Sequence, residues 1–127
     1  MMEKSLNNLL VIIDDEADIL DLLTYNFSRA GFRVEGFERA RPALEFVQKE
    51  RPALILCDWM MPEMNGIEFC REVKSHVETA DIPLIMVTCR NEKQARRTAL
   101  AEGVSDYIAK PIRIPELMGR VNAFISR

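Results

Sequence analysis

The sequence predicts one α/β domain, a doubly wound (βα)5 chain with a five-stranded parallel sheet in the order 2-1-3-4-5. Short apolar runs alternate with segments whose apolar residues recur at helical spacing, which is typical of βαβ units. Most of the runs are almost continuously apolar, as expected for strands buried on both faces of a parallel sheet. Because crossover connections are right-handed, the helices cover both faces, and 2-1-3-4-5 is the common order for five such units.

The first half of the chain contains three predicted strands, at residues 9–13, 33–37 and 54–57. Gly31 ends the first helix, whose apolar residues recur at helical spacing: Ile19, Leu20, Leu22, Leu23 and Phe27. Residues 40–49 form the second helix, and its buried stripe contains Leu44 and Val47.

The second half continues the alternation. A loop rich in proline and glycine, residues 60–66, precedes a helix with the apolar residues Ile67, Phe69, Cys70 and Val73. Pro83 opens the fourth strand, and residues 92–102 form a helix that Gly103 ends. The fifth strand is residues 105–109. The last helix starts at Pro115, and we expect three of its residues to face inward: Leu117, Val121 and Phe124.

Composition and charge argue against several functional classes. The net charge of −3 makes direct contact with nucleic acid by this segment unfavourable. The start of the chain has no signal-peptide layout and no apolar run is long enough to span a bilayer, so we expect a cytoplasmic protein without membrane contact. The three cysteines, Cys57, Cys70 and Cys89, lack metal-ligand or redox spacing, and we expect them as small apolar residues in or near the core.

Residues able to handle phosphate follow or end four of the predicted strands. Asp14 and Asp15 follow the first strand, Asp58 follows the third, Thr88 ends the fourth and Lys110 follows the fifth. Ligands bind at the carboxyl ends of the strands in such sheets, so we expect these residues at one edge. Three carboxylates held close together need a cation, and Mg²⁺ binds carboxylates, water and phosphate oxygens. An aspartate nucleophile, a lysine and a hydroxyl beside that metal form a set suited to phosphoryl transfer.

Each of these residues also has a simpler interpretation. Asp14 and Asp15 would cap the following helix, where acids offset the helix dipole, and Asp58 would be a turn residue. Thr88 would be a cap or turn residue and Lys110 would be solvated. The phosphoryl-transfer interpretation is favoured because all four features occur together at strand ends in the right order.

These motifs resemble those of the receiver domain of bacterial two-component response regulators. VIIDDE at residues 11–16 resembles the acidic pair of that family, and DWMMPEMNG at residues 58–66 resembles its phosphoacceptor motif. VT at residues 87–88 and YIAKP at residues 107–111 resemble the remaining two motifs. The resemblance implies a flavodoxin-like receiver domain over residues 1–127, with no output domain among them.

The resemblance also implies roles for the acidic and basic residues. Asp58 would accept the phosphoryl group from a phosphohistidine of a sensor histidine kinase. Asp15 and Asp58 would bind Mg²⁺ directly, together with the backbone carbonyl of Met60, and Asp14 would act mainly through bound water. Lys110, joined to the next proline by a cis peptide bond, would pair with the phosphoryl group.

Two further residues would form the switch by the same resemblance. Thr88 would move to hydrogen-bond the phosphate and Tyr107 would turn inward behind it, although without the resemblance Tyr107 is an ordinary half-buried strand residue. Cys89 stands where the family often has a smaller residue, so it would either narrow access to the acceptor or pack in the core. Met60 and Arg90 occupy variable positions that flank the phosphoryl group, and the sequence gives no direction for their effect.

Charged residues of alternating sign in the last third resemble the dimer interface of response regulators of the winged-helix transcription-factor class. The implied pairs across a two-fold axis are Arg96 with Glu116, Asp106 with Arg120, and Glu102 with Arg127. A solvated face without a partner is the simpler alternative. The expectation is a phosphorelay component that forms a homodimer when phosphorylated and regulates transcription. A stand-alone receiver that acts by protein–protein contact is the alternative.

Two other functions fit part of the pattern. A phosphohydrolase with an aspartate nucleophile usually needs a second aspartate two residues later as acid and base. Met60 occupies that position, so we do not expect an enzyme that turns over an external substrate. A receiver-like module that never takes phosphate is disfavoured by the intact set of site residues. Failure to bind millimolar Mg²⁺ would support it.

Overall fold

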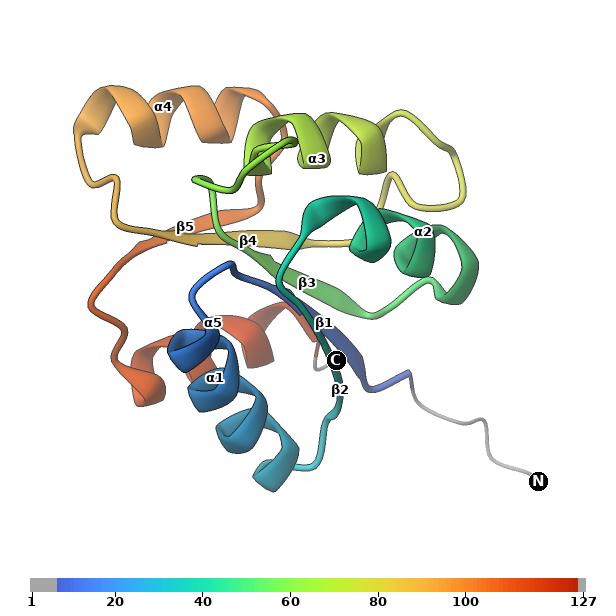
Figure 1. The fold of residues 1–127 in the computed structure, drawn as a ribbon, viewed down its shortest axis with the longest axis vertical. Helices are drawn as coiled ribbons and strands as arrows, with labels where there is room; N and C mark the ends of the chain where they lie inside the picture. Colours follow the sequence, from blue (N-terminus) through green and yellow to red (C-terminus); the bar gives the residue numbers. More distant parts are fainter. Residues whose placement is uncertain (1–6, 126–127) are drawn as a thin grey trace.

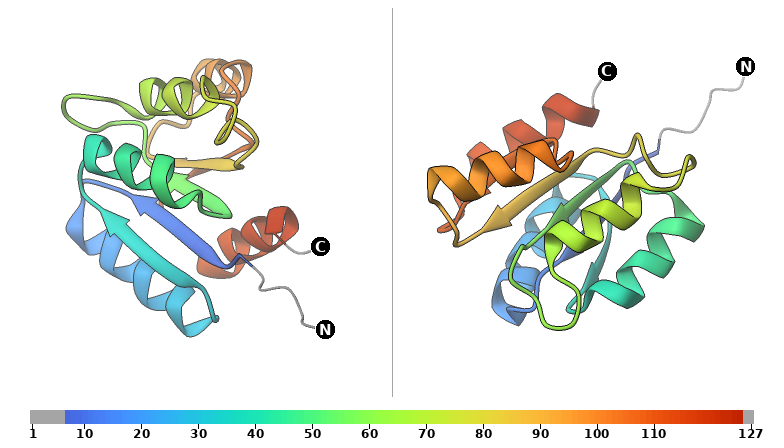
Figure 2. Two further views of the ribbon diagram at one scale, coloured as in Figure 1. Left: turned by 90° about the vertical axis from the view of Figure 1, so that its right-hand side faces the viewer. Right: turned by 90° about the horizontal axis from the view of Figure 1, so that it is seen from above.

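The computed structural model describes residues 7–125, in which five strands alternate with five helices. Their bounds are β1 (Leu9–Ile13), α1 (Ala17–Arg29), β2 (Arg33–Phe37), α2 (Ala40–Glu50), β3 (Leu54–Cys57), α3 (Gly66–Lys74), β4 (Leu84–Thr88), α4 (Lys93–Ala101), β5 (Asp106–Ala109) and α5 (Ile114–Ile125). All strand pairs are parallel and the order is β2-β1-β3-β4-β5, which confirms the predicted topology. Figures 1 and 2 show α1 and α5 on one face of the sheet and α2, α3 and α4 on the other.

The sheet separates two apolar layers. Along β1, Leu10 and Ile12 pack in the layer beneath α1 and α5, whereas Val11 and Ile13 pack beneath α2, α3 and α4. Every residue of β1, β3 and β4 is buried, while the edge strand β2 contains no buried residue. Burying one such aliphatic side chain contributes about 1.5–3 kcal/mol, so the central strands hold the loops at their carboxyl ends on a rigid platform.

Local signals set the helix ends. Gly31 and Gly103 follow α1 and α4 with φ angles of 101° and 103°, a left-handed conformation that glycine adopts without strain. At the start of α3, the Asn65 side chain accepts the Glu68 N–H at 2.9 Å and the Asn65 N–H donates to the Glu68 carboxylate at 2.9 Å. This capping box anchors the loop that follows β3. Within residues 7–125, no helix is long and apolar enough to cross a membrane.

One apolar side chain of α5 is not where the sequence predicts it. Leu117 and Val121 are buried as expected, but Phe124 is 42% exposed. The inward stripe continues at the same four-residue interval to Ile125, which packs against the α1–α5 layer. Phe124 lies one position off that stripe and faces solvent.

The cysteines divide between core and surface. Cys57 and Cys70 are buried as predicted, and burial raises the pKa of both thiols. Cys89 is exposed, so its prediction as a core residue is wrong. It follows the last residue of β4 and therefore lies in the loop above the sheet edge, outside both apolar layers.

Candidate functional site

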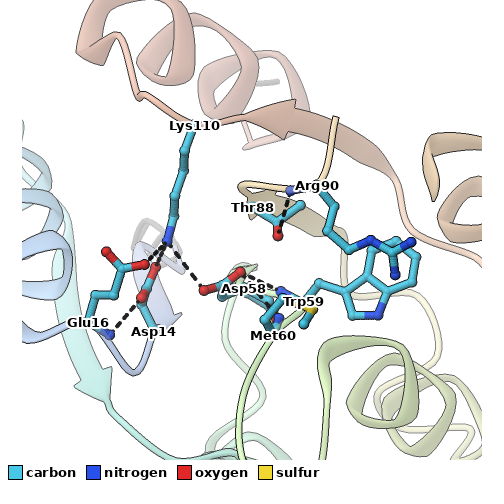
Figure 3. Close-up of polar contacts among 9 residues, drawn as sticks. Asp14, Glu16, Asp58, Trp59, Met60, Thr88, Arg90 and Lys110 are labelled. Carbon is cyan, nitrogen blue, oxygen red and sulfur yellow. Dashed lines mark hydrogen bonds and ion pairs between the residues drawn. The ribbon is translucent and has the colours of Figure 1, made fainter. Parts of the chain in front are cut away.

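Four charged side chains from the carboxyl ends of β1, β3 and β5 meet at one edge of the sheet. The Lys110 Nζ lies 3.0 Å from Asp14 Oδ2, 3.2 Å from Glu16 Oε2 and 3.3 Å from Asp58 Oδ2 (Figure 3). The side chains of Lys110, Asp14 and Asp58 are 7%, 3% and 5% exposed, whereas that of Glu16 is 54% exposed. The Lys110–Pro111 peptide bond is cis, as the resemblance implies.

Burial and charge act in opposite directions on these groups. Burial raises the pKa of Asp14, although the Glu16 N–H and the Lys110 ammonium favour its ionised form. Burial alone would lower the pKa of Lys110, but the hydrogen bond to Asp14 and the charges of Asp58 and Asp14 outweigh it and raise that pKa. Lys110 is therefore a permanent cation among carboxylates, and it is held where an added phosphoryl oxygen would need a partner.

The backbone of the loop after β3 orients Asp58. Asp58 Oδ1 accepts the N–H of Trp59 at 2.7 Å and the N–H of Met60 at 3.4 Å, so Oδ2 faces Lys110. Gly66 packs against this turn, since a Cβ at that position would lie 2.3 Å from the Asp58 carbonyl oxygen. A side chain at position 66 would thus displace the backbone that presents the carboxylate.

The acidic residues offer a set of oxygen ligands. Asp14, Glu16 and Asp58 provide carboxylate oxygens that all lie within 4.8 Å of one another, and hard divalent cations prefer such ligands. Asp15 is exposed and does not belong to this group. The sequence prediction assigned no role to Glu16, although its place two residues after Asp14 in the same turn was a usable signal. The assignments of Asp15 and of the Met60 carbonyl to the metal remain predictions.

The predicted switch residues lie beside the acceptor. Thr88 is buried at the end of β4, and its Oγ1 accepts the Arg90 N–H at 3.4 Å. Tyr107 is 2% exposed and points inward, and its hydroxyl donates to the Arg90 carbonyl. The Tyr107 ring also meets the Trp59 ring edge-on, with the centroids 6.4 Å apart. Figure 3 shows Thr88 between Asp58 and Arg90.

The residues predicted for a dimer face form contacts within one chain. Arg120 pairs with Asp106 at 2.5 Å and with Glu116 at 3.6 Å. Arg96 donates to the Tyr107 carbonyl at 3.2 Å. Glu102 accepts a two-point ion pair from Arg71 of α3, at 2.8 and 2.9 Å, which the sequence did not reveal. Arg127 lies outside the described residues, and the pairs across a two-fold axis remain predictions.

Comparisons with known proteins agree with this geometry. The response regulator receiver domain profile matches residues 10–122. The phosphate regulon transcriptional regulatory protein PhoB of Rhizobium meliloti (strain 1021) is 40% identical over 118 residues, which are 93% of this chain and 52% of that protein. This chain therefore spans about half the length of that curated relative.

Solved structures extend the likeness to three dimensions. The receiver domain of the Francisella response regulator 1452 matches with a TM-score of 0.88 at 26% identity, covering 95% of this chain and 98% of that one. The BeF3-activated DrrB receiver domain matches with a TM-score of 0.85 at 25% identity, covering 94% and 97% of the two chains. The charged site lies at the sheet edge that the motifs predicted, and the receiver domain profile matches almost the whole chain. The chain therefore belongs to the family of response regulator receiver domains.

Proposed function

We propose that this receiver domain is a Mg²⁺-dependent phosphorylation switch in which Asp58 accepts a phosphoryl group from a phosphohistidine of a sensor histidine kinase. The observation that supports this most is the buried Asp58 carboxylate, held by two backbone N–H groups and 3.3 Å from the Lys110 ammonium. A carboxylate that is oriented and paired in this way is a nucleophile with its counter-charge already in place.

The transfer step balances without any further reactant. A carboxylate oxygen of Asp58 forms a bond to phosphorus while the bond from phosphorus to the kinase imidazole nitrogen breaks. The kinase imidazole, which carries a proton on its other ring nitrogen, leaves with the bonding electron pair as a neutral ring, and an acyl phosphate remains on Asp58. Lys110 pairs with a phosphoryl oxygen, and the Thr88 hydroxyl donates a hydrogen bond to another. Water reverses the modification by hydrolysing the acyl phosphate.

The acidic side chains fit a magnesium ion. We assign Asp15, Asp58 and the Met60 carbonyl as direct ligands and Asp14 as a ligand through water. Because Asp15 is exposed, its side chain has to turn toward Asp58 for this assignment to hold. Glu16 already lies beside Asp14 and Asp58 and adds a further carboxylate to the site. The bound ion supplies positive charge that offsets the carboxylates and the incoming phosphoryl group.

Phosphorylation would act on the face formed by α4, β5 and α5 through Thr88 and Tyr107. We propose that this face then forms a homodimer and that the output is regulation of transcription, as the name of the Rhizobium meliloti relative states for that protein. A stand-alone receiver that acts through another partner is the second candidate. In either case the domain modifies only itself, is cytoplasmic, and makes no direct contact with nucleic acid.

Mass and sedimentation measurements with Mg²⁺ and beryllofluoride, which mimics a phosphoryl group on Asp58, test the proposal. A shift from monomer to dimer is the expected result and supports both the acceptor and the output face. Binding without a dimer supports the acceptor and favours a stand-alone receiver. If the protein binds neither Mg²⁺ nor beryllofluoride, the phosphorylation switch is wrong and a phosphate-free module takes its place.

A further inference from the structure

We propose that Arg90 is a positioning residue that joins the acceptor loop, residues 58–65 between β3 and α3, to the inward-pointing Tyr107 of β5. In this role Arg90 acts on Trp59 and Tyr107 rather than on the phosphoryl group. This inference rests on the proposed function, since it concerns how the phosphorylated state of Asp58 is stabilised. Three sets of contacts made by Arg90 support it. Figure 3 shows Arg90 and the Trp59 ring on the side of Thr88 away from Lys110.

The first contact is with the acceptor loop. The Arg90 guanidinium lies over the Trp59 ring, with Cζ 4.5 Å from the ring centroid. Trp59 is only 8% exposed, and its backbone N–H donates to Asp58 Oδ1 at 2.7 Å. A cation over the face of a largely buried indole is a favourable contact that water does not replace well. Arg90 therefore helps to fix the peptide unit between Asp58 and Trp59, whose N–H orients the acceptor carboxylate.

The second contact is with the switch residues. The Arg90 carbonyl accepts the Tyr107 hydroxyl, and the Arg90 N–H donates to Thr88 Oγ1 at 3.4 Å. Tyr107 stays inward only while that carbonyl remains in place, because burial removes the hydroxyl from water. The stacking on Trp59 holds the Arg90 side chain, while the Arg90 carbonyl holds the Tyr107 hydroxyl. The acceptor loop and Tyr107 are therefore both anchored through Arg90.

The third contact is an ion pair between the Arg90 guanidinium and the Glu92 carboxylate. Arg90 Nη2 lies 3.2 Å from Glu92 Oε2, and Glu92 is the N-cap residue of α4. Direct binding of a phosphoryl group on Asp58 by the guanidinium would compete with its contacts to the indole and to the Glu92 carboxylate. Lys110 already stands 3.3 Å from Asp58 and can pair with the phosphoryl group without such a loss. The arrangement therefore favours a positioning role over direct phosphate binding.

Phosphorylation by acetyl phosphate with Mg²⁺, measured by intact mass, tests the role of Arg90. In Arg90→Met, the acetyl phosphate concentration that phosphorylates half of the protein should rise about fivefold, the size expected for losing one cation–π contact. Arg90→Lys, which keeps a cation over the ring, should recover most of this loss. Arg97→Met, which removes an exposed arginine from α4, is the matched control and should behave like the wild type.

Fluorescence provides a second signal, because Trp59 is the only tryptophan in the chain. Removing the guanidinium in Arg90→Met should change the emission of the unphosphorylated protein, and Arg97→Met should not. Unchanged emission in Arg90→Met would overturn the stacking on which the inference depends.

A double-mutant cycle with Trp59→Leu separates positioning from direct phosphate binding. If Arg90 acts through Trp59, Arg90→Met should change the half-saturating concentration less than twofold in the Trp59→Leu background. A fivefold change in both backgrounds would show direct action on the phosphoryl group and overturn the inference. If Trp59→Leu does not fold, the emission of Trp59 in Arg90→Met still tests the stacking on which the inference depends. A wild-type protein that takes no phosphate would refute the proposed function itself, whereas a phosphorylated Arg90→Met indistinguishable from wild type would refute only this inference.

Discussion

Two regions of the molecule carry several charges: the acceptor edge, which consists of Asp14, Glu16, Asp58 and Lys110, and the α4–β5–α5 face. They differ in how far the charged side chains are buried. At the acceptor edge the side chains of Lys110, Asp14 and Asp58 are at most 7% exposed. On the face, the side chains of Arg120 and Glu116 are 39% and 49% exposed. Removing one partner of a buried pair leaves a charge that water cannot reach, at a cost of about 3–5 kcal/mol, whereas an exposed pair contributes about 0–1 kcal/mol.

This difference separates a fixed reaction site from an exchangeable surface. Asp106 and Glu116 both bind Arg120 of their own chain, and Glu102 binds Arg71. The proposed dimer assigns Asp106, Glu116 and Glu102 to partners across a two-fold axis. The Asp106 side chain is 17% exposed and the other side chains of these pairs are 29% or more exposed, so water reaches every pair. Replacing an internal partner by an external one therefore changes the free energy little. A small shift of α4 and β5 can therefore change the ion-pair partners on this face, while the geometry of the acceptor edge stays intact.

The largest effect is expected from Asp58→Asn at the acceptor edge. The amide oxygen can still accept the Trp59 N–H, so the fold should persist, but an amide is not a nucleophile toward phosphorus and phosphorylation should be abolished. Intact mass after treatment with acetyl phosphate and Mg²⁺, with circular dichroism as the control for folding, measures this. Phosphate retained on the folded variant would contradict the assignment of Asp58.

Lys110→Met tests the buried charges themselves. Without the ammonium, Asp14, Glu16 and Asp58 repel one another, and the free energy of unfolding at pH 7 without Mg²⁺ should fall by about 3 kcal/mol. Mg²⁺ should restore part of this loss, because it replaces the missing positive charge. Urea unfolding with and without Mg²⁺ measures both values, and the exposed Lys93→Met should change stability by less than about 0.5 kcal/mol. A variant as stable as the wild type would show that the carboxylates do not depend on Lys110.

The acceptor edge was predictable because its position follows from strand topology. The apolar runs of β1, β3 and β4 and the parallel order place Asp14, Asp58 and Thr88 at one edge whatever the loops do. The sequence could not distinguish Asp15 from Glu16 as the neighbour of Lys110, because side-chain direction just past a strand has no fixed period.

Contacts between loops and on the exposed face were harder to predict. The stacking of Arg90 on Trp59 joins two loops whose relative position only the fold determines. Arg71–Glu102 likewise joins α3 to the end of α4, with no signal in the local sequence of either residue. Side-chain placement on helices was predictable to within one position, as Phe124 shows by lying beside the stripe that ends at Ile125.

On the exposed face, Arg120→Ala should affect the dimer more than the fold. The dissociation constant of the beryllofluoride-bound dimer should rise about tenfold, because the two-fold axis makes the variant lose two charge pairs of about 0.7 kcal/mol each, while the monomer loses no more than about 1 kcal/mol. Sedimentation velocity measures the dimer, and an unchanged profile would count against this face. Charge reversal sharpens the test: Asp106→Arg and Arg120→Asp should each fail to dimerise, and mixing the two should restore a dimer only if the pair forms across the axis.

Arg71→Ala should have the smallest effect and tests whether Glu102 changes partners. The Arg71 side chain is 60% exposed and that of Glu102 is 29% exposed, so removing the pair should lower the free energy of unfolding by at most about 1 kcal/mol, measured in urea. If Glu102 turns to Arg127 of a second protomer, freeing it from Arg71 removes a competitor, and the beryllofluoride-bound dimer should tighten about twofold. Glu102→Gln, which cannot form an ion pair with either arginine, should then weaken the dimer. A dimer that Arg71→Ala leaves unchanged would mean that Glu102 stays bound within its own chain, and that the exchange of partners on this face is confined to Asp106, Glu116 and Arg120.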